Sequence, residues 1–543
     1  MGVGARQQAI IGWAREWLAP GLLLGGLSLL LAWVLGGLSP SFIDPDESAH
    51  YVNALFIGDW LRVGLPSPLP FAEAYYQHYP KLSIGHWPPG WYGLLSPIFA
   101  LFRPSPLTAL ALSAFVAGLP ALLVLRVLRR LGHPRLGLLA AGLYLLLPLV
   151  LEAGRHFLLD QPVTLLFGLG VLAWAAAVER TSLPRFLLFA GLVAAAALTK
   201  GNGLALALVP LFDILLGRRW ALLRDLRLWA AGLVAILLIA PWYWISTRIS
   251  AGGFNYEAGP AYAWEALRAN LEALDANIPL GTVALAAAFL MRPHGDARAR
   301  RMARLCLSVL LAVLAFQSLV PVALAPRYMN PVLPWATILV ALAVGRGWAA
   351  ARDFRGEYRP MPQLAAALLL ALAIGVGAVR AAQLTPKTDA GAPALAGAMA
   401  ARPGIWLADG RAGGEGAVIA AAAHRDEARR IWVVRSSQWL SESDFMGRGY
   451  RLIARTPDEV RAVLDRLGAT GVVIVAERDR FAYPHSALLA RAVQDQGWRL
   501  ERRSFTTGQG FVLVATRRAP IRPNFDALTN RSANAAKLKG ALD

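Results

Sequence analysis

Long runs of apolar residues recur through the first 385 positions and set the expected architecture. Most approach or exceed the ~18 residues with which an α-helix can cross a ~30 Å hydrocarbon core. We expect spans at about 17–38, 106–125, 136–153, 163–178, 186–200, 203–217, 229–245, 279–291, 305–324, 331–349 and 362–380. The pattern therefore predicts an all-α polytopic membrane protein with about eleven transmembrane helices.

Residues 87–102 are the ambiguous apolar segment. They are short and open with Pro88 and Pro89, which fits either a span or a helix lying in the interface. Loop charge decides, because cytoplasmic loops carry an excess of Lys and Arg. With 87–102 interfacial and the N-terminus cytoplasmic, the arginines gather in the cytoplasmic loops at 126–135, 180–185, 218–227, 292–304 and 346–359. Counting 87–102 as a span would reverse every later loop and remove this bias, so we expect a large first outer loop.

The pattern changes after about residue 385. Strand-like apolar runs alternate with helical stretches such as 456–468 and 486–497, which is typical of a small α/β domain. The runs lie at 405–409, 431–435, 471–477, 498–505 and 510–516. An odd number of spans places this domain on the outer side. We expect a transmembrane domain over 1–384, an extracytoplasmic α/β domain over 385–518 and a flexible tail over 519–543.

Composition narrows the class of protein. The chain is 56% hydrophobic and 16% charged, and its mean hydropathy of +0.47 excludes a soluble globular protein for most of its length. The net charge of +20 comes from the loop arginines, so we expect membrane lipids and no nucleic acid as partners. Cys306 is the single cysteine, which excludes an intramolecular disulfide. The first apolar run lacks a convincing cleavage site and is expected to remain as a helix.

The densest group of ionisable residues follows the first span. Asp44, Asp46, Glu47 and His50 fall within seven positions. Closely spaced carboxylates suit the binding of a cation or the activation of a hydroxyl by a general base. A solvated loop with an Asp-Pro turn is the alternative interpretation.

Ionisable residues in other predicted outer segments are weaker candidates for a functional site, and each segment also has an ordinary structural interpretation. These alternatives are an aromatic anchor, a helix cap, a snorkelling lysine and an interfacial arginine. All the segments fall on one side of the predicted topology, which indicates one outward-facing cavity with carboxylates and phosphate-binding cations. A membrane-embedded, phosphate-linked lipid suits such a cavity. The candidate residues are His86, Arg155, Asp160, Lys200 and Arg327.

Motif order adds a resemblance to a known family. The segments Asp46-Glu47, His86-Trp87-Pro88-Pro89, Asp160-Gln161-Pro162, Thr199-Lys200-Gly201 and Arg327-Tyr328 resemble motifs of membrane-embedded GT-C glycosyltransferases. The nearest lineages are the protein O-mannosyltransferases and the aminoarabinose transferases, which are similar to glycosyltransferase family 39. The resemblance covers about residues 10–380, and only the combination of motifs is specific.

The resemblance implies inverting transfer of a sugar from a polyprenyl-phosphate carrier to a hydroxyl acceptor on a lipid, glycan or protein. Asp46 would be the base or would orient the acceptor, with Glu47 supporting it. Lys200 and Arg327, with Tyr328, would hold the donor phosphate, and His86 would contact the phosphate or a metal. Asp44, His50, Arg155 and Asp160 would complete the pocket. The need for a divalent cation stays open, with Asp46, Glu47 and His86 as candidate ligands.

The composition, rich in Ala, Leu, Arg and Gly, suggests a bacterial source and hence the cytoplasmic membrane, with the site on its outer face. A lipid transporter or flippase without transferase chemistry is the alternative. Its marks are inverted repeats and charged residues near the bilayer midplane. The sequence shows no long repeat, and its ionisable groups gather at one face, which favours the transferase.

Overall fold

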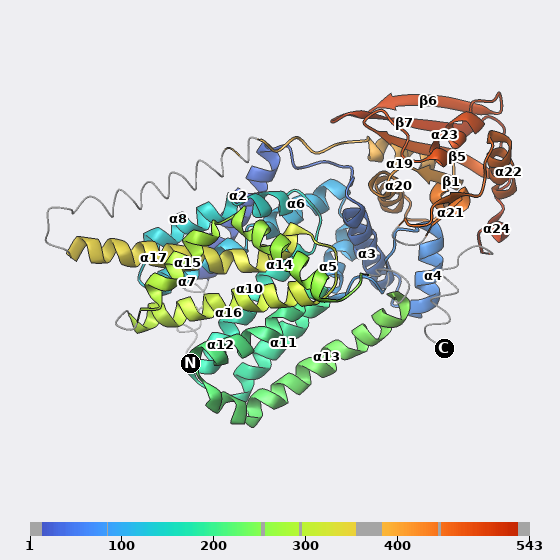
Figure 1. Cartoon of the computed structure of the whole chain (residues 1–543). Coiled ribbons are helices and arrows are strands. Elements are labelled where there is room, and N and C mark those ends of the chain that lie inside the picture. Colours follow the sequence, from blue (N-terminus) through green and yellow to red (C-terminus); the bar gives the residue numbers. More distant parts are fainter. Residues whose placement is uncertain are drawn as a thin grey trace.

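The computed structural model describes residues 14–83, 85–250, 256–292, 296–353, 379, 383–443 and 447–529. A bundle of helices carries a mixed α/β domain at one end (Figure 1). This architecture confirms the predicted fold class of a helical, multi-pass membrane protein with a small C-terminal α/β domain. The predicted span at 362–380 lies outside the described residues, except for Val379.

The first part of the chain forms the bundle and the helices at its end. In chain order the elements are η1 Ala14–Leu18, α2 Ala19–Val34, α3 Pro45–Arg62, α4 Pro68–His78, α5 Gly90–Phe102, α6 Pro106–Ala117, α7 Pro120–Arg130, α8 Pro134–Leu145, α9 Pro148–Ala153, α10 Asp160–Glu179, α11 Leu183–Thr199, η2 Gly201–Leu208, α12 Val209–Gly217, η3 Trp220–Arg224, α13 Leu226–Ser250, α14 Pro260–Asp275, α15 Leu280–Leu290, α16 Ala297–Leu319, η4 Pro326–Val332 and α17 Leu333–Asp353.

Six helical segments in the described part are long and apolar enough to cross a membrane. They are Glu16–Val34, Pro106–Arg130, Asp160–Glu179, Leu226–Ile249, Ala297–Leu319 and Pro326–Ala349. The pair α14 and α15, bent by 83° at the break between them, is a candidate for a seventh. Shorter apolar helices, among them α8, α11 and the η2–α12 pair, fill the rest of the bundle.

The predicted span at 136–153 is interrupted in the structure. Helix α8 ends at Leu145 and α9 begins at Pro148. The break has a local cause, because the residue before a proline avoids the helical region of backbone space. Leu147 accordingly has extended angles of φ −64° and ψ 136°.

The C-terminal domain is built on a five-stranded sheet of order β2-β1-β5-β7-β6. Strands β1, β2 and β5 are parallel, and β7 and β6 continue the sheet antiparallel. Its elements are α19 Ala392–Ala401, β1 Gly404–Asp409, α20 Ala412–Arg425, β2 Ile431–Arg435, α21 Ser436–Trp439, β3 Ser441–Glu442, β4 Arg451–Leu452, α22 Pro457–Leu467, β5 Ala469–Glu477, α23 Pro484–Ala492, β6 Trp498–Ser504, β7 Gly510–Arg517 and α24 Phe525–Thr529.

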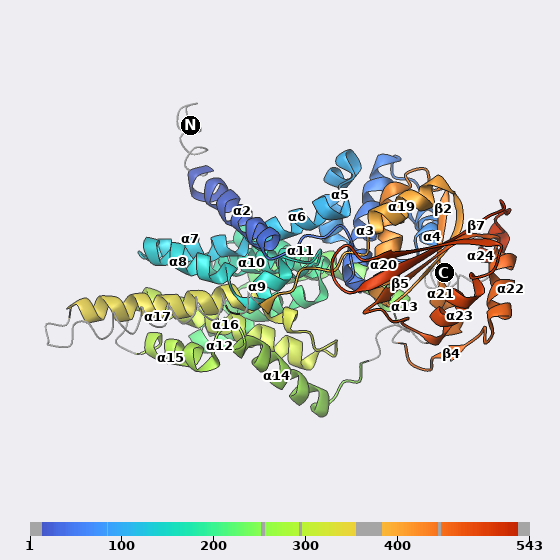
Figure 2. The ribbon, with the colours of Figure 1, turned by 90° about the horizontal axis from the view of Figure 1, so that it is seen from above.

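This domain packs directly on α3. Figures 1 and 2 both place α20 beside α3, and the two helices share one apolar core. The approach is close enough to need glycine, since a Cβ added to Gly413 would lie 1.5 Å from the carbonyl oxygen of Ile43. Lys81 Nζ donates a hydrogen bond of 3.2 Å to the Ala412 carbonyl at the start of α20. The C-terminal domain therefore covers the beginning of α3, where the carboxylates lie.

Candidate functional site

The start of α3 presents Asp46. Asp44 caps the helix by accepting a 2.8 Å hydrogen bond from the Asp46 amide, and Pro45 supplies a backbone angle suited to the first helical position. Asp46 thus lies in the first turn, with its side chain 28% exposed. Burial raises the pKa of Asp46 above its ordinary value, while Arg327 acts in the opposite direction. A carboxylate with a raised pKa is a better proton acceptor.

Asp46 is the outer member of a chain of alternating charges that we call the charged quartet: Asp46, Arg327, Asp160 and Lys200. Arg327 Nη2 donates to Asp46 Oδ2 at 2.6 Å, and Arg327 Nε lies 3.8 Å from Asp160 Oδ2. Lys200 Nζ donates to Asp160 Oδ1 at 2.6 Å. The side chains of Asp160 and Lys200 are buried, whereas that of Arg327 is 29% exposed. The quartet therefore runs from an accessible ion pair to a buried one.

Local sequence explains why separate elements meet here. Asp160 is the first residue of α10, where a negative charge is favoured by the helix dipole. Lys200 is extended between α11 and η2, and a Cβ on Gly203 would lie 2.3 Å from the Ala196 carbonyl oxygen. Only glycine permits this tight return of the chain. Arg327 lies in η4, and its carbonyl accepts a 2.8 Å hydrogen bond from Asn330 Nδ2.

Tyr328 lies between the two cations of the quartet. Lys200 Nζ is 4.9 Å from the centre of its ring, and the Arg327 guanidinium carbon is 5.9 Å away. Cations over an aromatic face are attracted by the ring quadrupole. The ring therefore helps to hold both cations beside the buried carboxylate.

His50 and the loop before α5 form a neighbouring aromatic wall. His50 Nδ1 and Tyr92 OH share a 2.6 Å hydrogen bond, and the Trp87 ring lies edge-on to His50 at 4.8 Å. Burial, followed by Lys200 and Arg327, holds the pKa of His50 well below its ordinary value, so His50 is neutral at pH 7. His86 precedes Trp87 in this loop, and burial lowers the pKa of His86 as well.

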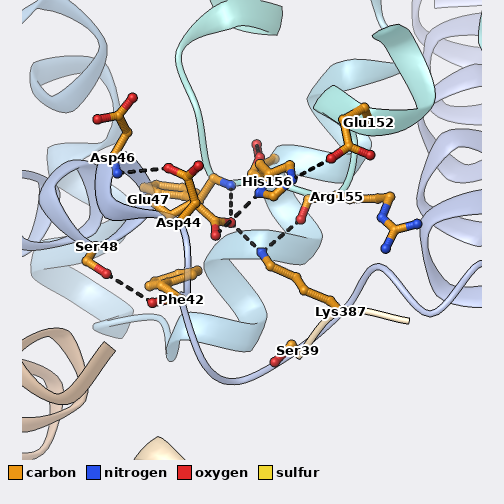
Figure 3. A network of polar contacts seen from close by, with 12 residues as sticks. Ser39, Phe42, Asp44, Asp46, Glu47, Ser48, Glu152, Arg155, His156 and Lys387 are labelled. Atoms are coloured by element: carbon orange, nitrogen blue, oxygen red, sulfur yellow. Dashed lines mark hydrogen bonds and ion pairs between the residues drawn. The ribbon is translucent and has the colours of Figure 1, made fainter. Parts of the chain in front are cut away.

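Glu47 and Arg155 lie apart from the quartet. Adjacent residues of a helix do not face one another, so the Glu47 side chain leaves α3 in a different direction from Asp46. It accepts from Lys387 Nζ at 2.5 Å and from the Phe157 amide at 2.9 Å (Figure 3). Arg155 donates to the Thr385 carbonyl. Glu47, expected to support Asp46, therefore does not contact the quartet through its side chain, and Arg155, expected in the pocket, points to the connection instead.

The candidate metal ligands also diverge. Across the described ranges, no group of three or more His, Cys, Asp or Glu side chains converges as an ion site would require. Asp46 pairs with Arg327, and Glu47 is occupied by Lys387. Asp46, Glu47 and His86 therefore do not form one metal centre in this arrangement.

Sequence reasoning missed the partners of Glu47. His156 follows Arg155 in a segment that the sequence did single out, and its Nδ1 lies 3.4 Å from Glu47 Oε2. Lys387 stands alone in the connection to the C-terminal domain, where no motif or periodicity marks it. A single lysine outside any motif can be recognised as part of a buried ion pair only when the structure shows the carboxylate that it contacts.

His156 predicts a dependence of stability on pH. Burial lowers its pKa, but Glu47 and Glu152 outweigh this and raise it to about 9. A group with a raised folded pKa contributes stability that is complete below the unfolded value of about 6.5 and is lost as pH rises through the folded value. We expect the melting temperature in detergent to fall as pH rises from 7 to 10, and to fall less for His156→Gln. His133→Gln, in the turn before α8, is the control. Identical pH profiles for wild type and His156→Gln would contradict this assignment.

Known proteins share sequence with one segment of this chain and share the fold with nearly all of it. Residues 86–245 match the family described as dolichyl-phosphate-mannose-protein mannosyltransferase. The fold is similar to apo ArnT from Cupriavidus metallidurans, with a TM-score of 0.55 and 16% identity over 93% of this chain and 98% of that one. ArnT bound to undecaprenyl phosphate gives 0.53 and 16%, over 94% and 99%. An Archaeoglobus fulgidus oligosaccharyltransferase in complex with Zn and sulfate gives 0.50 and 12%, over 90% and 72%. No curated protein matches the sequence significantly.

The family match over residues 86–245 and the fold over nearly the whole chain are both similar to those of GT-C membrane glycosyltransferases. This confirms the resemblance expected from the motifs, and the family match marks residues 86–245 as a segment of the glycosyltransferase type. Its particular likeness is to ArnT in fold, over nearly the whole of both chains, and to the protein mannosyltransferases over residues 86–245.

Proposed function

We propose that the chain transfers a sugar from a polyprenyl-phosphate carrier to a hydroxyl acceptor, with inversion at the anomeric carbon. The observation that carries this proposal is the charged quartet, which puts two cations and a carboxylate with a raised pKa in one place. The solved ArnT complex with undecaprenyl phosphate supports a donor of this class. We assign the reaction to the outer face of a bacterial cytoplasmic membrane, on the basis of the loop charges.

The donor phosphate binds at the exposed side of Arg327. A guanidinium can hold two phosphate oxygens at once, and it exchanges its Asp46 partner for the incoming anion. Lys200, buried beside Asp160, provides the second contact to the phosphate, at a position where water screens its charge little. These fixed cations stabilise the negative charge that grows on the phosphate as it leaves.

Asp46, once released from Arg327, accepts the proton of the acceptor hydroxyl. The hydroxyl oxygen forms a bond to the anomeric carbon as the bond between that carbon and the phosphate oxygen breaks. The polyprenyl monophosphate takes the bonding electron pair, and the proton passes from Asp46 to solvent. Attack from the face opposite the leaving phosphate inverts the anomeric configuration.

In this proposal the two domains have different roles in the transfer reaction. Residues 1–384 form the transferase domain, and residues 385–518 form an outer domain that closes over the start of α3. The expected tail begins at residue 519, but its described part packs on the outer domain, where Asn524 donates to the Leu467 and Arg466 carbonyls at 3.0 Å each. The acceptor reaches Asp46 from the aqueous side, beside α20.

Transfer of label from a synthetic polyprenyl-phosphate sugar tests the function. Purified protein in liposomes is incubated with the labelled donor and with envelope lipids, glycans or proteins as acceptors. We expect acceptor-linked label together with an equal amount of free polyprenyl phosphate. Movement of intact donor across the bilayer without release of polyprenyl phosphate would instead establish a lipid transporter.

A further inference from the structure

Glu47 is a fully buried carboxylate held by two other segments of the chain, residues 156–157 and Lys387. Lys387 Nζ lies 2.5 Å from its Oε1, His156 Nδ1 lies 3.4 Å from its Oε2, and the Phe157 amide donates to Oε1 at 2.9 Å (Figure 3). The side chain of Glu47 has no exposed surface, and that of Lys387 is 7% exposed. A buried charge is stable only when it is paired and hydrogen-bonded in this manner.

Lys387 belongs to the connection between the bundle and the C-terminal domain. Its Nζ also donates to the Arg155 carbonyl at 2.9 Å, and its amide donates to the Gly36 carbonyl at 2.7 Å. Neighbouring residues of the connection are tied to the same end of the bundle. Ser39 Oγ donates to the Thr388 carbonyl at 3.1 Å, and Arg155 donates to the Thr385 carbonyl.

Glu47 and its partner Phe157 lie close in sequence to Asp46 and Asp160, the two acidic members of the charged quartet. Glu47 is the residue after Asp46, and Phe157 lies three residues before Asp160. The Glu47 carboxylate therefore ties the first turn of α3 to the segment that leads into α10. Through those two attachments it sets the separation of the two acidic members of the charged quartet.

We propose that Glu47, His156 and Lys387 form an interdomain clasp that positions Asp46, and that the connection to the C-terminal domain is thereby a working part of the catalytic centre. These are positioning residues, since Glu47 is joined to Asp46 only through the backbone and His156 and Lys387 act through Glu47. The proposal rests on the proposed function. It also gives the C-terminal domain a role, because its connection carries the lysine that neutralises Glu47.

Loss of the clasp is expected to act on kcat more than on KM. The donor phosphate contacts Arg327 and Lys200, and neither makes a contact with the clasp that would be lost. Asp46 is displaced instead, and a misplacement of about 1 Å can lower a rate by roughly 100-fold. We therefore expect Lys387→Met to lower kcat by roughly 10- to 100-fold, with KM for the donor within about twofold of wild type.

A matched control is available at the other end of α3. Arg103 forms a buried ion pair with Asp59 and donates to the carbonyls of Ala423 and His424, so it also joins α3 to the C-terminal domain. Arg103→Met removes the same kind of interaction between the same two parts, far from the first turn of α3. We expect it to lower the melting temperature as Lys387→Met does and to leave kcat nearly unchanged.

The experiment measures kcat and KM for the labelled donor with wild type, Lys387→Met, Lys387→Arg, Arg103→Met and Asp46→Asn. Lys387→Arg should recover most of the lost rate, because the positive charge returns. Adding Glu47→Gln to Lys387→Met should lower kcat little further, since both changes break the same pair. If Lys387→Met does not fold, Lys387→Gln replaces it.

The outcomes separate this proposal from the proposed function. An active wild type, an inactive Asp46→Asn and a fully active Lys387→Met would overturn the clasp alone. Equal losses of kcat in Lys387→Met and Arg103→Met would also overturn it, because they would indicate only weakened docking. A wild-type protein that transfers no sugar would count against the function itself.

Discussion

Asp46→Asn is expected to lower the rate of sugar transfer by roughly 10²- to 10⁴-fold, the contribution typical of a general base. The amide has almost the shape of the carboxylate but cannot take the acceptor proton. The variant should insert in the membrane normally, because Asp46 is partly exposed and Asp44 still caps α3. Steady-state kinetics with labelled donor measures the effect as kcat.

The same substitution should not weaken donor binding. In the ligand-free arrangement Asp46 competes with the phosphate for Arg327 at 2.6 Å, and Asn removes that competition. KM for the donor should be unchanged or lower, although kcat is strongly reduced. Glu73→Gln, which removes an exposed carboxylate in α4 on the same outer loop, is the control and should keep full activity. Wild-type turnover by Asp46→Asn would remove Asp46 from the reaction.

Lys200→Met is expected to be the most destabilising single change in the quartet. It removes the 2.6 Å partner of Asp160, whose side chain is 1% exposed. Breaking one half of a buried ion pair typically costs about 3–5 kcal/mol, because the remaining charge stays buried without its partner. The nearest other cation, Arg327 Nε, is 3.8 Å away and only partly replaces the lysine. Equilibrium or thermal unfolding in detergent measures the loss.

A second substitution separates stability from function. Adding Asp160→Asn to Lys200→Met removes the unpaired charge, so most of the lost stability should return. Transfer activity should not return, because the cation proposed for the donor phosphate is still missing. Arg268→Gln breaks an exposed ion pair with Glu272 and should change neither property. A double variant that recovers activity along with stability would show that Lys200 has only a structural role.

The members of the charged quartet could be named from the sequence because each lies where a span begins or ends. Asp46 follows the first span, Asp160 opens α10, Lys200 joins α11 to η2, and Arg327 lies in η4. Loop charge alone placed these four on one side of the predicted topology. The structure brings them together in one chain of ion pairs.

The clasp was not predictable in the same way. Glu47 is adjacent to Asp46, so a linear motif makes the two look like one unit, although the helix points them in different directions. Lys387 is 340 residues away from Glu47 and lies in a connection without periodicity. The break between α8 and α9 was missed for another reason, because hydropathy does not register the backbone restriction that precedes Pro148.

Equilibrium binding of labelled polyprenyl phosphate, without its sugar, tests most directly whether the charged quartet is the donor site. The purified proteins to compare are wild type, Asp46→Asn, Arg268→Gln and the Lys200→Met/Asp160→Asn double variant. We predict that the first three bind with similar affinity and that the double variant binds at least roughly tenfold more weakly, because a charge-assisted phosphate contact is lost. Undiminished binding by a folded double variant would contradict the assignment of the phosphate to this pocket.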